Sequence, residues 1–235
     1  GYAVWYSGSP LTGELESLLL RHGFLPTLVG SSAPLLLVDM RSPAVLVQNI
    51  PTTLKQPFSD DRQVLSAAQQ AHLRFQEAVA GLYPGTLVLS LNAEVIYPRL
   101  VRKIVEAGGV PAEPTVPRVL GPKMCVPFGK ILRGNAIPNT VTKTIHTDKV
   151  FAPDLRSFTI QPFPGYAPLR SQIRTVKSFR RPVILVDDLL HSGNRVNALD
   201  PLFREEGVEI DQVLVGLLSG RGRDLMAAKG RAVDS

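Results

Sequence analysis

The stretch that decides the fold is Val183-Ile-Leu-Val-Asp-Asp-Leu-Leu-His-Ser-Gly-Asn-Arg195, in one-letter code VILVDDLLHSGNR. Four apolar residues run directly into two adjacent carboxylates, and a Ser-Gly turn with an arginine follows. A short apolar run that ends in turn signals predicts a buried strand. Because ligands of open α/β sheets bind beyond the carboxyl ends of the strands, we expect Asp187 and Asp188 to lie at a ligand-binding edge. The alternative is a strand end with two solvated acids, neutralised by Arg180 and Arg181.

The turn that follows the two acids has the composition of a phosphate site. Successive backbone N–H groups that lead into a helix attract an anion, and Gly193 lets the backbone approach a ligand closely. A serine hydroxyl and a planar guanidinium add donors for phosphate oxygens. We therefore expect the turn Leu189–Asn194, with Ser192 and Gly193, and the guanidinium of Arg195 to hold the phosphate of a ligand. Adjacent carboxylates accept hydrogen bonds from ribose hydroxyls and bind Mg²⁺, which makes Asp187 and Asp188 candidate metal ligands.

Outward from this stretch, apolar runs alternate with helical patterns. The strands are expected at residues 86–91, 124–128, 183–186 and 212–218, and the helices at 60–82, with Ser59 as N-cap, and at 93–107. This alternation predicts an α/β fold with a mostly parallel sheet flanked by helices. The helix after the acid motif is expected to be broken or kinked, because Asp200-Pro201 has the pattern of an N-cap followed by proline.

Two further regions stand apart from this pattern. Residues 1–55 are expected to form a small N-terminal α/β segment, with a helix at 14–21 and two apolar runs, 35–39 and 44–47, separated by a turn at Ser42-Pro43; residues 56–235 are expected to form the main domain. Residues 129–181 are polar and proline-rich, as in a functional loop, lid or hairpin. Because the chain opens in what looks like a strand and stops abruptly, we expect a fragment of a longer protein, fused to another domain.

Composition narrows the classes of function. The chain has 26 basic and 20 acidic residues, a formal charge of +6, which favours anionic ligands. The basic residues are dispersed, so nucleic-acid binding is weakly supported. The apolar runs are too short for a membrane span. The lone Cys125 cannot form an internal disulfide and is expected to be inert. These features favour a cytoplasmic protein without a membrane partner.

The acid motif resembles the phosphoribosyl-pyrophosphate (PRPP) motif of type I phosphoribosyltransferases: a hydrophobic strand, two acids, three variable residues, Thr or Ser, Gly, any residue, and Thr or Ser. The match covers Val183–Val186, Asp187, Asp188, Ser192 and Gly193, and it fails at Arg195, where the family has a small hydroxyl residue. The resemblance implies that the two acids grip the ribose and that His191–Arg195 hold its 5′-phosphate. More narrowly, the chain resembles phosphoribosyltransferase-like regions in the C-terminal part of bacterial cytidyltransferase-related proteins.

The resemblance extends over residues 60 to 230. TLVLSLNAEVIYPRLVRKIVEAGGVP looks like the family's strand, pyrophosphate loop and helix, although the loop lacks the usual glycines. NTVTKTIHTDKVF looks like its flexible catalytic loop. The resemblance implies pyrophosphate contacts from Asn92, Ala93, Lys130 and Arg133, and charged catalytic groups at Lys143, His146 and Lys149. These lysines and the histidine could equally be ordinary loop residues.

The resemblance implies a domain that binds PRPP and Mg²⁺, transfers phosphoribose to a nitrogenous base and releases pyrophosphate; it is compatible with a homodimer. The first alternative is a non-catalytic module that senses PRPP, ribose 5-phosphate or a nucleotide. The others are an interaction domain without a ligand and a nucleic-acid-binding domain. The acceptor base cannot be read from the sequence.

Overall fold

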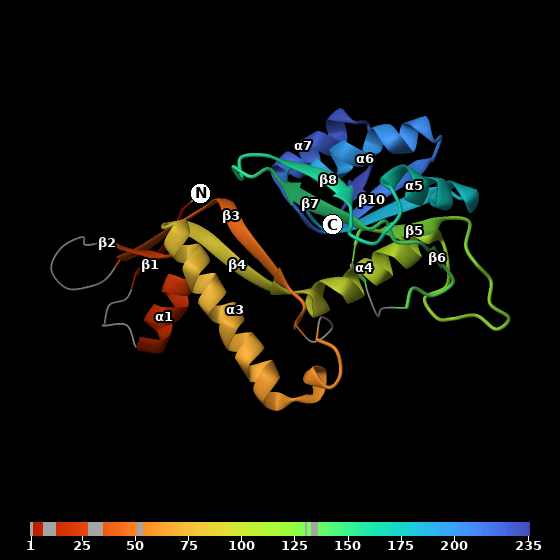
Figure 1. Ribbon diagram of the computed structural model, residues 1–235. Coiled ribbons are helices and arrows are strands. Elements are labelled where there is room, and N and C mark those ends of the chain that lie inside the picture. The colour runs from red at the N-terminus through yellow and green to blue at the C-terminus, as the bar shows by residue number, and fades with distance from the viewer. Residues whose placement is uncertain (1, 7–12, 28–34, 51–53, 130, 133–135) are drawn as a thin grey trace. The chain divides into compact units, whose positions relative to one another are not determined.

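The computed structural model describes residues 2–6, 13–27, 35–50, 54–129, 131–132 and 136–235. The chain divides into two compact units, Gly1–Ala93 and Glu94–Ser235. Each unit contains its own sheet, and Figure 1 labels the helices and strands.

The first unit is a four-stranded mixed sheet with helices. Its central strand β3 pairs with all three of the others. Helix α1 packs beside α3, which crosses from β3 to its parallel neighbour β4 (Figure 1). The elements are β1 (Tyr2–Tyr6), α1 (Gly13–Arg21), β2 (Leu25–Thr27), β3 (Leu35–Gln48), the 3-10 turn η1 (Phe58–Asp60), α3 (Arg62–Leu82) and β4 (Thr86–Asn92).

Strand β3 corrects the expected turn at Ser42-Pro43, because residues 35–48 form one continuous strand. Its first half pairs antiparallel with β1 and β2, and its second half, Ala44–Gln48, pairs parallel with β4. The register with β4 shifts between Asp39 and Ala44. Proline has no N–H for a ladder and is tolerated at such irregularities, so Pro43 marks a change of partner and not a turn.

Helix α3 also begins later than expected. Its N-cap is Asp61, whose side chain accepts hydrogen bonds from the backbone N–H groups of Gln63 and Val64. Ser59, the expected cap, lies in η1 and donates to Asp60. Because α3 and β4 pack in the first unit, that unit continues to Ala93 and extends beyond the expected leading segment of residues 1–55.

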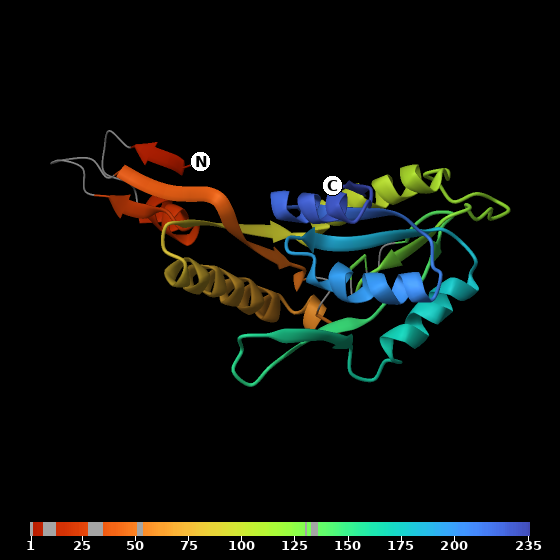
Figure 2. The same cartoon turned by 90° about the horizontal axis from the view of Figure 1, so that it is seen from above.

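The second unit is a five-stranded parallel sheet in the order β6-β5-β9-β10-β11. Figure 2 shows α4 and α7 on one face of this sheet, and α5 and α6 on the other. The strands are β5 (Met124–Pro127), β6 (Val141–Thr142), β9 (Val183–Leu190), β10 (Ile210–Leu218) and β11 (Val233–Asp234). The helices are α4 (Ala93–Gly108), α5 (Leu169–Ser178), α6 (Asn194–Glu205) and α7 (Gly220–Ala228).

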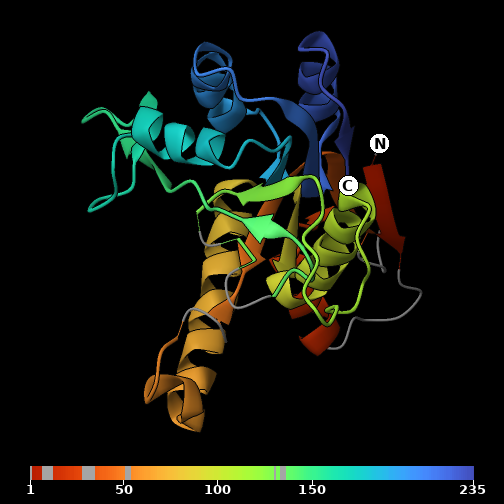
Figure 3. The same cartoon turned by 90° about the vertical axis from the view of Figure 1, so that its right-hand side faces the viewer.

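The passage 129–181 contains regular structure that the sequence pattern only partly predicts. Strands β7 (Thr147–Phe151) and β8 (Phe158–Pro162) form an antiparallel hairpin. Figure 3 shows this hairpin beside α5. The hairpin was one of the expected alternatives, whereas α5 was not predicted. Helix α5 buries Gln172, Ile173 and Val176 along one side, so its apolar stripe is short and easily missed in a basic sequence.

The predicted α/β class with a parallel sheet and flanking helices is confirmed for this unit, with three corrections. Strand β4 belongs to the sheet of the first unit, because β3 is its parallel partner. Strand β9 continues to Leu190, four residues beyond the apolar run, because Leu189 and Leu190 still pair with β10. Helix α6 is not broken at Pro201 but runs from Asn194 to Glu205.

The reason for the third correction is the environment of Asp200. Its side chain is buried and does not cap a helix; it pairs with Arg231, Arg204 and Lys229. A buried carboxylate surrounded by three cations is fixed in place. The sequence pattern Asp-Pro therefore indicates a helix start that the tertiary ion pairs override.

The strand order places a topological switch point in the second unit. The chain passes from β5 outward to β6 on one side, and later returns to β9 on the other side of β5. The central strands are apolar and buried, as expected for strands covered on both faces. In doubly wound sheets the crevice beyond the carboxyl ends of the strands at such a point is where ligands bind. The fold thus predicts a ligand site at the carboxyl ends of β5 and β9.

Among the residues that the structure describes, no helix combines the length and the apolar character needed to cross a membrane.

The N-cap assignment of α3 can be tested. Replacing Asp61 with Ala removes both cap hydrogen bonds and is expected to lower the free energy of unfolding by about 1 kcal/mol. Ser59→Ala, which removes one solvent-exposed hydrogen bond to Asp60, is the control and is expected to change it by less than about 0.5 kcal/mol. Urea denaturation measures both. The reverse order of the two effects would return the cap to Ser59.

Candidate functional site

The turn between β9 and α6 begins the candidate site. Gly193 has a φ of 63° and is the N-cap residue of α6. The backbone angle therefore favours glycine, and a Cβ at this position would also require the end of the Leu225 side chain to move. No described side chain caps α6, and the N–H groups of its first turn are the donors that helix N-termini offer to anions.

Asp187 and Arg195 form an ion pair inside this site. Both carboxylate oxygens of Asp187 lie 2.7 Å from Nη1 of Arg195. The Asp187 side chain is 5% exposed and that of Arg195 is 27% exposed. The guanidinium also lies 5.3 Å from the centre of the Phe128 ring, within the range of a cation–π contact. The alternative of two solvated acids is therefore wrong for Asp187, which is buried and paired.

Burial and the ion pair act on Asp187 in opposite directions. Burial raises the pKa of Asp187 to about 7, and the neighbouring Arg195 charge opposes this rise while Asp188 adds to it. Burial dominates because a carboxylate removed from water loses its hydration, and one partly exposed guanidinium does not replace it.

The ion pair leaves one polar group unsatisfied. Nε of Arg195 is buried and has no hydrogen-bond partner among the described residues. A buried donor without a partner costs about 1–3 kcal/mol. The observed position of Arg195 is therefore held by Asp187 and Phe128 at the expense of one unmade hydrogen bond.

Asp188 has a different environment from its neighbour. It is half-buried, its Oδ1 accepts from the N–H of Leu189, and it forms no ion pair among the described residues. Successive residues of a strand point to opposite faces of the sheet, which explains why only Asp187 meets Arg195 from α6.

A cavity of about 180 Å³ is built on these residues. It is lined by the unbroken run Asp187–Val196 and by Lys149 from β7. His191 and Asn194 are exposed, Ser192 accepts a hydrogen bond from Asn194, and the carbonyl of His191 accepts one from Ser219. The structure thus brings Lys149, from the expected catalytic loop, to the same cavity as the Asp187–Arg195 part of the acid motif.

A second cavity of about 330 Å³ lies at the ends of β5 and β6. Its floor is apolar, with Pro127, Ile131, Leu132 and Ile137, and the polar lining includes three threonines. His146 and Tyr166 form one wall, stacked with ring centres 3.8 Å apart. Pro127, at the end of β5, is in register with Val186 of β9. Strand β7 contributes to both cavities, because Thr147 lines this one and Lys149 lines the other.

Gln172 of α5 holds the His146 wall in place. Its side-chain oxygen accepts from the N–H of His146 at 2.7 Å, and its amide donates to the carbonyl groups of His146 and Ala167. Burial, together with the charge of Lys143, lowers the pKa of His146. The imidazole is therefore neutral at neutral pH and offers one donor and one acceptor.

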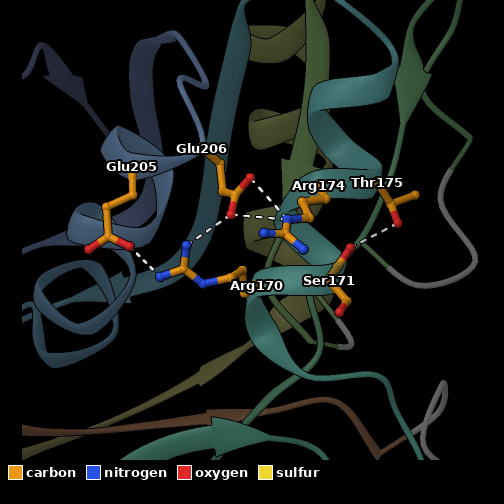
Figure 4. A network of polar contacts seen from close by, with 6 residues as sticks. All are labelled: Arg170, Ser171, Arg174, Thr175, Glu205 and Glu206. Carbon is orange, nitrogen blue, oxygen red and sulfur yellow. Dashed lines mark hydrogen bonds and ion pairs between the residues drawn. The ribbon is translucent and has the colours of Figure 1, made fainter.

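An ion-pair cluster in turn fastens α5 to the C-terminal end of α6. Figure 4 shows Glu206 between the guanidinium groups of Arg170 and Arg174, with Arg170 also bonded to Glu205. The arginines lower the pKa of Glu206, Arg174 most strongly. Helix α6 thereby carries the phosphate-type turn at its start and the support of the His146 wall at its end.

Other expected site residues are not brought to these cavities. Lys143 is exposed and lines neither of them. Asn92 ends β4 in the sheet of the first unit, and Ala93 is fully buried at the start of α4; neither is a lining residue of the two cavities. Lys130 and Arg133 lie outside the described residues.

Sequence reasoning also missed residues of the site. Phe128, Phe163, Tyr166 and Gln172 contribute a cation–π partner, an aromatic wall and its support. An aromatic pair in FPGY, directly before a short helical stretch, was the available signal. The positions of Phe163 and Tyr166 depend on the hairpin that precedes them. The sequences of β7 and β8 alternate too weakly between apolar and polar residues to predict that hairpin.

A metal ion or a reactive cysteine is weakly supported by side-chain geometry. Among the described residues, no group of three or more His, Cys, Asp or Glu side chains could hold a metal ion. In this structure Arg195 contacts both oxygens of Asp187, whereas the half-buried Asp188 could serve as a single carboxylate ligand. Burial raises the pKa of Cys125 to about 12, so its thiol is protonated and unreactive at neutral pH.

Comparison with known proteins identifies no relative: no protein-family model matches the chain, and no curated protein matches it significantly.

The raised pKa of Asp187 predicts the direction in which stability changes with pH. The pKa of Asp187 in the folded chain, about 7, lies above the ordinary aspartate pKa of 3.8, so the folded chain holds the proton more tightly than the unfolded chain. The stability that this carboxyl contributes is therefore present below the lower value and is lost as the pH rises towards the upper one. Unfolding free energies of the wild type and Asp187→Asn, measured across this range, should show the difference (wild type minus variant) falling with pH. A difference that rises with pH would mean that Arg195 outweighs burial.

Proposed function

We propose that the Glu94–Ser235 unit binds a phosphorylated ribose, presented as PRPP, ribose 5-phosphate or a nucleotide, at the carboxyl edge of its parallel sheet. The observation that carries the proposal is the cavity lined by Asp187–Val196 and Lys149 at the switch point of the sheet. It combines two acids, a helix N-terminus, a guanidinium and an ammonium group. The fold would then be that of a type I phosphoribosyltransferase, as the resemblance of the motif implies.

The phosphate would lie in the β9–α6 turn. The first-turn N–H groups of α6 and the hydroxyl of Ser192 are donors suited to phosphate oxygens, and Arg195 supplies a planar cation. Lys149 adds a second positive charge on the side of the hairpin. Such a site recognises the anion through directed donors and not through net charge alone.

The ribose would lie over the two acids. Hydroxyl groups donate to carboxylates, and Asp188 is half-buried and lines the cavity. Mg²⁺ typically uses one or two protein carboxylates together with substrate phosphates. Asp188 would therefore hold Mg²⁺ that arrives with a pyrophosphate, and the ion would neutralise phosphate charge there.

A ring attached to the ribose would enter the neighbouring cavity of about 330 Å³. Its apolar floor suits a flat ring, and the exposed part of Tyr166 offers a stacking surface. The threonine hydroxyls and the neutral imidazole of His146 can pair with ring nitrogen and oxygen atoms. Apolar pockets with a few polar groups are the usual form of small-molecule sites.

Transfer of phosphoribose to a nitrogenous base is the second candidate function. In that reaction the bond from C1 of the ribose to pyrophosphate breaks, a bond from C1 to a base nitrogen forms, and pyrophosphate leaves with the electron pair while the nitrogen loses a proton. The favouring observation is the hairpin segment, which places Lys149 at one cavity and His146 at the other. Lys149 would stabilise the leaving pyrophosphate, and a neutral His146 could accept the proton.

Binding without transfer is the better-supported function. The expected pyrophosphate loop, Ser90–Ala93, joins a strand of the other sheet, and Asp187 is occupied by Arg195. A sensor needs only the phosphate turn, the acids and the ring cavity. An interaction domain or a nucleic-acid binder would need none of them.

A thermal-shift titration with ribose 5-phosphate, and with PRPP and Mg²⁺, tests the proposal on the full chain. A ligand at a hundred times its Kd stabilises a protein by ~2.7 kcal/mol, which is a midpoint rise of roughly 5–11 °C for a domain of this size. We expect this rise for the wild type and a much smaller one for Asp187→Asn/Asp188→Asn.

Lys149→Gln is expected to weaken binding about tenfold or less, as for one exposed cation on a phosphate. Lys177→Gln on α5 is the matched control, because Lys177 is exposed and lines neither cavity; it should leave the shift unchanged. If none of these ligands raises the unfolding midpoint of the wild type, the proposal is wrong. Release of pyrophosphate from PRPP in the presence of bases separates transfer from binding.

A further inference from the structure

The ion pair between Asp187 and Arg195 occupies groups that the ligand would need. Both oxygens of Asp187 are taken by Nη1 of Arg195 at 2.7 Å, and Oδ1 also accepts from the N–H of Asp188. Only one acceptor position, on Oδ2, is left, so the carboxylate can accept from two ribose hydroxyls only if the guanidinium moves away. Equally, a phosphate can bond to Arg195 fully only if the guanidinium turns from Asp187.

The guanidinium is placed to make such a move. Arg195 is the second residue of α6 and lines the same cavity as Ser192, Gly193 and Asn194. Its Nε has no partner among the described residues, so its present position does not satisfy its donors. A phosphate in the turn would offer oxygens in the planar geometry that a guanidinium prefers.

Displacing Arg195 costs free energy when the ligand offers only a phosphate or only hydroxyl groups. A phosphate alone would draw Arg195 away and leave Oδ2 of the buried Asp187 without a partner among the described residues, either as an unpaired charge or, once the carboxyl group has taken up a proton, as an unsatisfied polar group. Hydroxyl groups alone would displace Arg195 from Asp187 without giving its charge a partner. Breaking a buried pair by removing one member is strongly destabilising, so each half-ligand binds poorly.

We propose that Arg195 is a specificity-determining residue that exchanges Asp187 for the ligand's phosphate, so that the site accepts a phosphate and ribose hydroxyls only when one molecule presents both. This inference rests on the proposed function. Recognition of the anion and recognition of the hydroxyls are then energetically coupled, and a coupling of this kind commonly changes affinity 5- to 150-fold. The departure from the motif at Arg195 thereby acquires a role.

The test compares ribose 5-phosphate with 2-deoxyribose 5-phosphate, which carries the same anion and lacks one hydroxyl. Calorimetric titration of the full chain gives the ratio of their two affinities for each variant. We expect the wild type to prefer ribose 5-phosphate by about tenfold or more, because the deoxy sugar does not replace Arg195 at Asp187. In Arg195→Gln both ligands bind more weakly and the ratio falls to about threefold or less, since the exchange no longer occurs.

Two further variants keep the result interpretable. Asp187→Asn/Arg195→Gln removes both charges together and leaves no buried ion, so it tests the ratio if Arg195→Gln alone does not fold; we expect the same small ratio. Arg102→Gln on α4 is a control on an exposed arginine outside the cavities and should keep the wild-type ratio. A nitrogen-15 NMR signal of Arg195 Nε should shift on addition of ribose 5-phosphate and much less on addition of inorganic phosphate.

Each outcome decides between the two proposals. Binding of ribose 5-phosphate with an equal affinity for its deoxy analogue overturns the exchange and leaves the proposed function standing. The same is true if Arg195→Gln preserves the wild-type ratio, because Arg195 would then be only a phosphate ligand. Tighter binding of both sugars to Arg195→Gln also overturns it, since Arg195 would merely block the site. Absence of binding to the wild type overturns both proposals.

Discussion

The pairing of β5 with β9 is the constraint on which the rest of the second unit depends. These strands come from distant parts of the chain, and their register sets Pro127 beside Val186. The pairing creates the switch point, brings the end of β5 next to the acid motif, and places Phe128 under the guanidinium of Arg195. Each cavity includes residues at or just after the carboxyl end of one of these two strands. A different neighbour for β9 would leave the acid motif without a site.

The two ends of α6 extend this arrangement over the face of the sheet. Its first turn follows Gly193 and contains Arg195, and the glutamates at its C-terminal end pair with the arginines of α5. Through Gln172, α5 then fixes the backbone of His146. One helix of twelve residues thus supports the phosphate-type turn and, through a neighbour, the aromatic wall of the other cavity.

Local patterns predict the buried strands and long helices well, because apolar runs and helical periodicity reflect burial directly. The strands expected at 86–91, 124–128 and 212–218 and the helix expected at 93–107 are present to within one or two residues, and the strand expected at 183–186 is present but continues to Leu190. What fails are statements that depend on partners distant in sequence. The sheet to which β4 belongs, the pairing of β3 across Pro43 and the buried environment of Asp200 are all decided by tertiary contacts. The proximity of Lys149 to the acid motif was inferred only through resemblance, whereas the Asp187–Arg195 pair follows from α6 lying on the face towards which Asp187 points.

The hairpin that carries Lys149 differs in kind from the sheet that carries the acids. Strands β7 and β8 pair only with each other among the described strands, and an isolated two-stranded ribbon has little stability of its own. Strand β9, which carries Asp187, lies instead between β5 and β10 in the centre of the sheet, where opening of the amides is expected to require the most extensive unfolding. In hydrogen exchange the amides of β9 should therefore outlast those of β7 by orders of magnitude. The wall of the cavity that carries Lys149 is thus expected to open locally many times for each opening of the wall that carries Asp187.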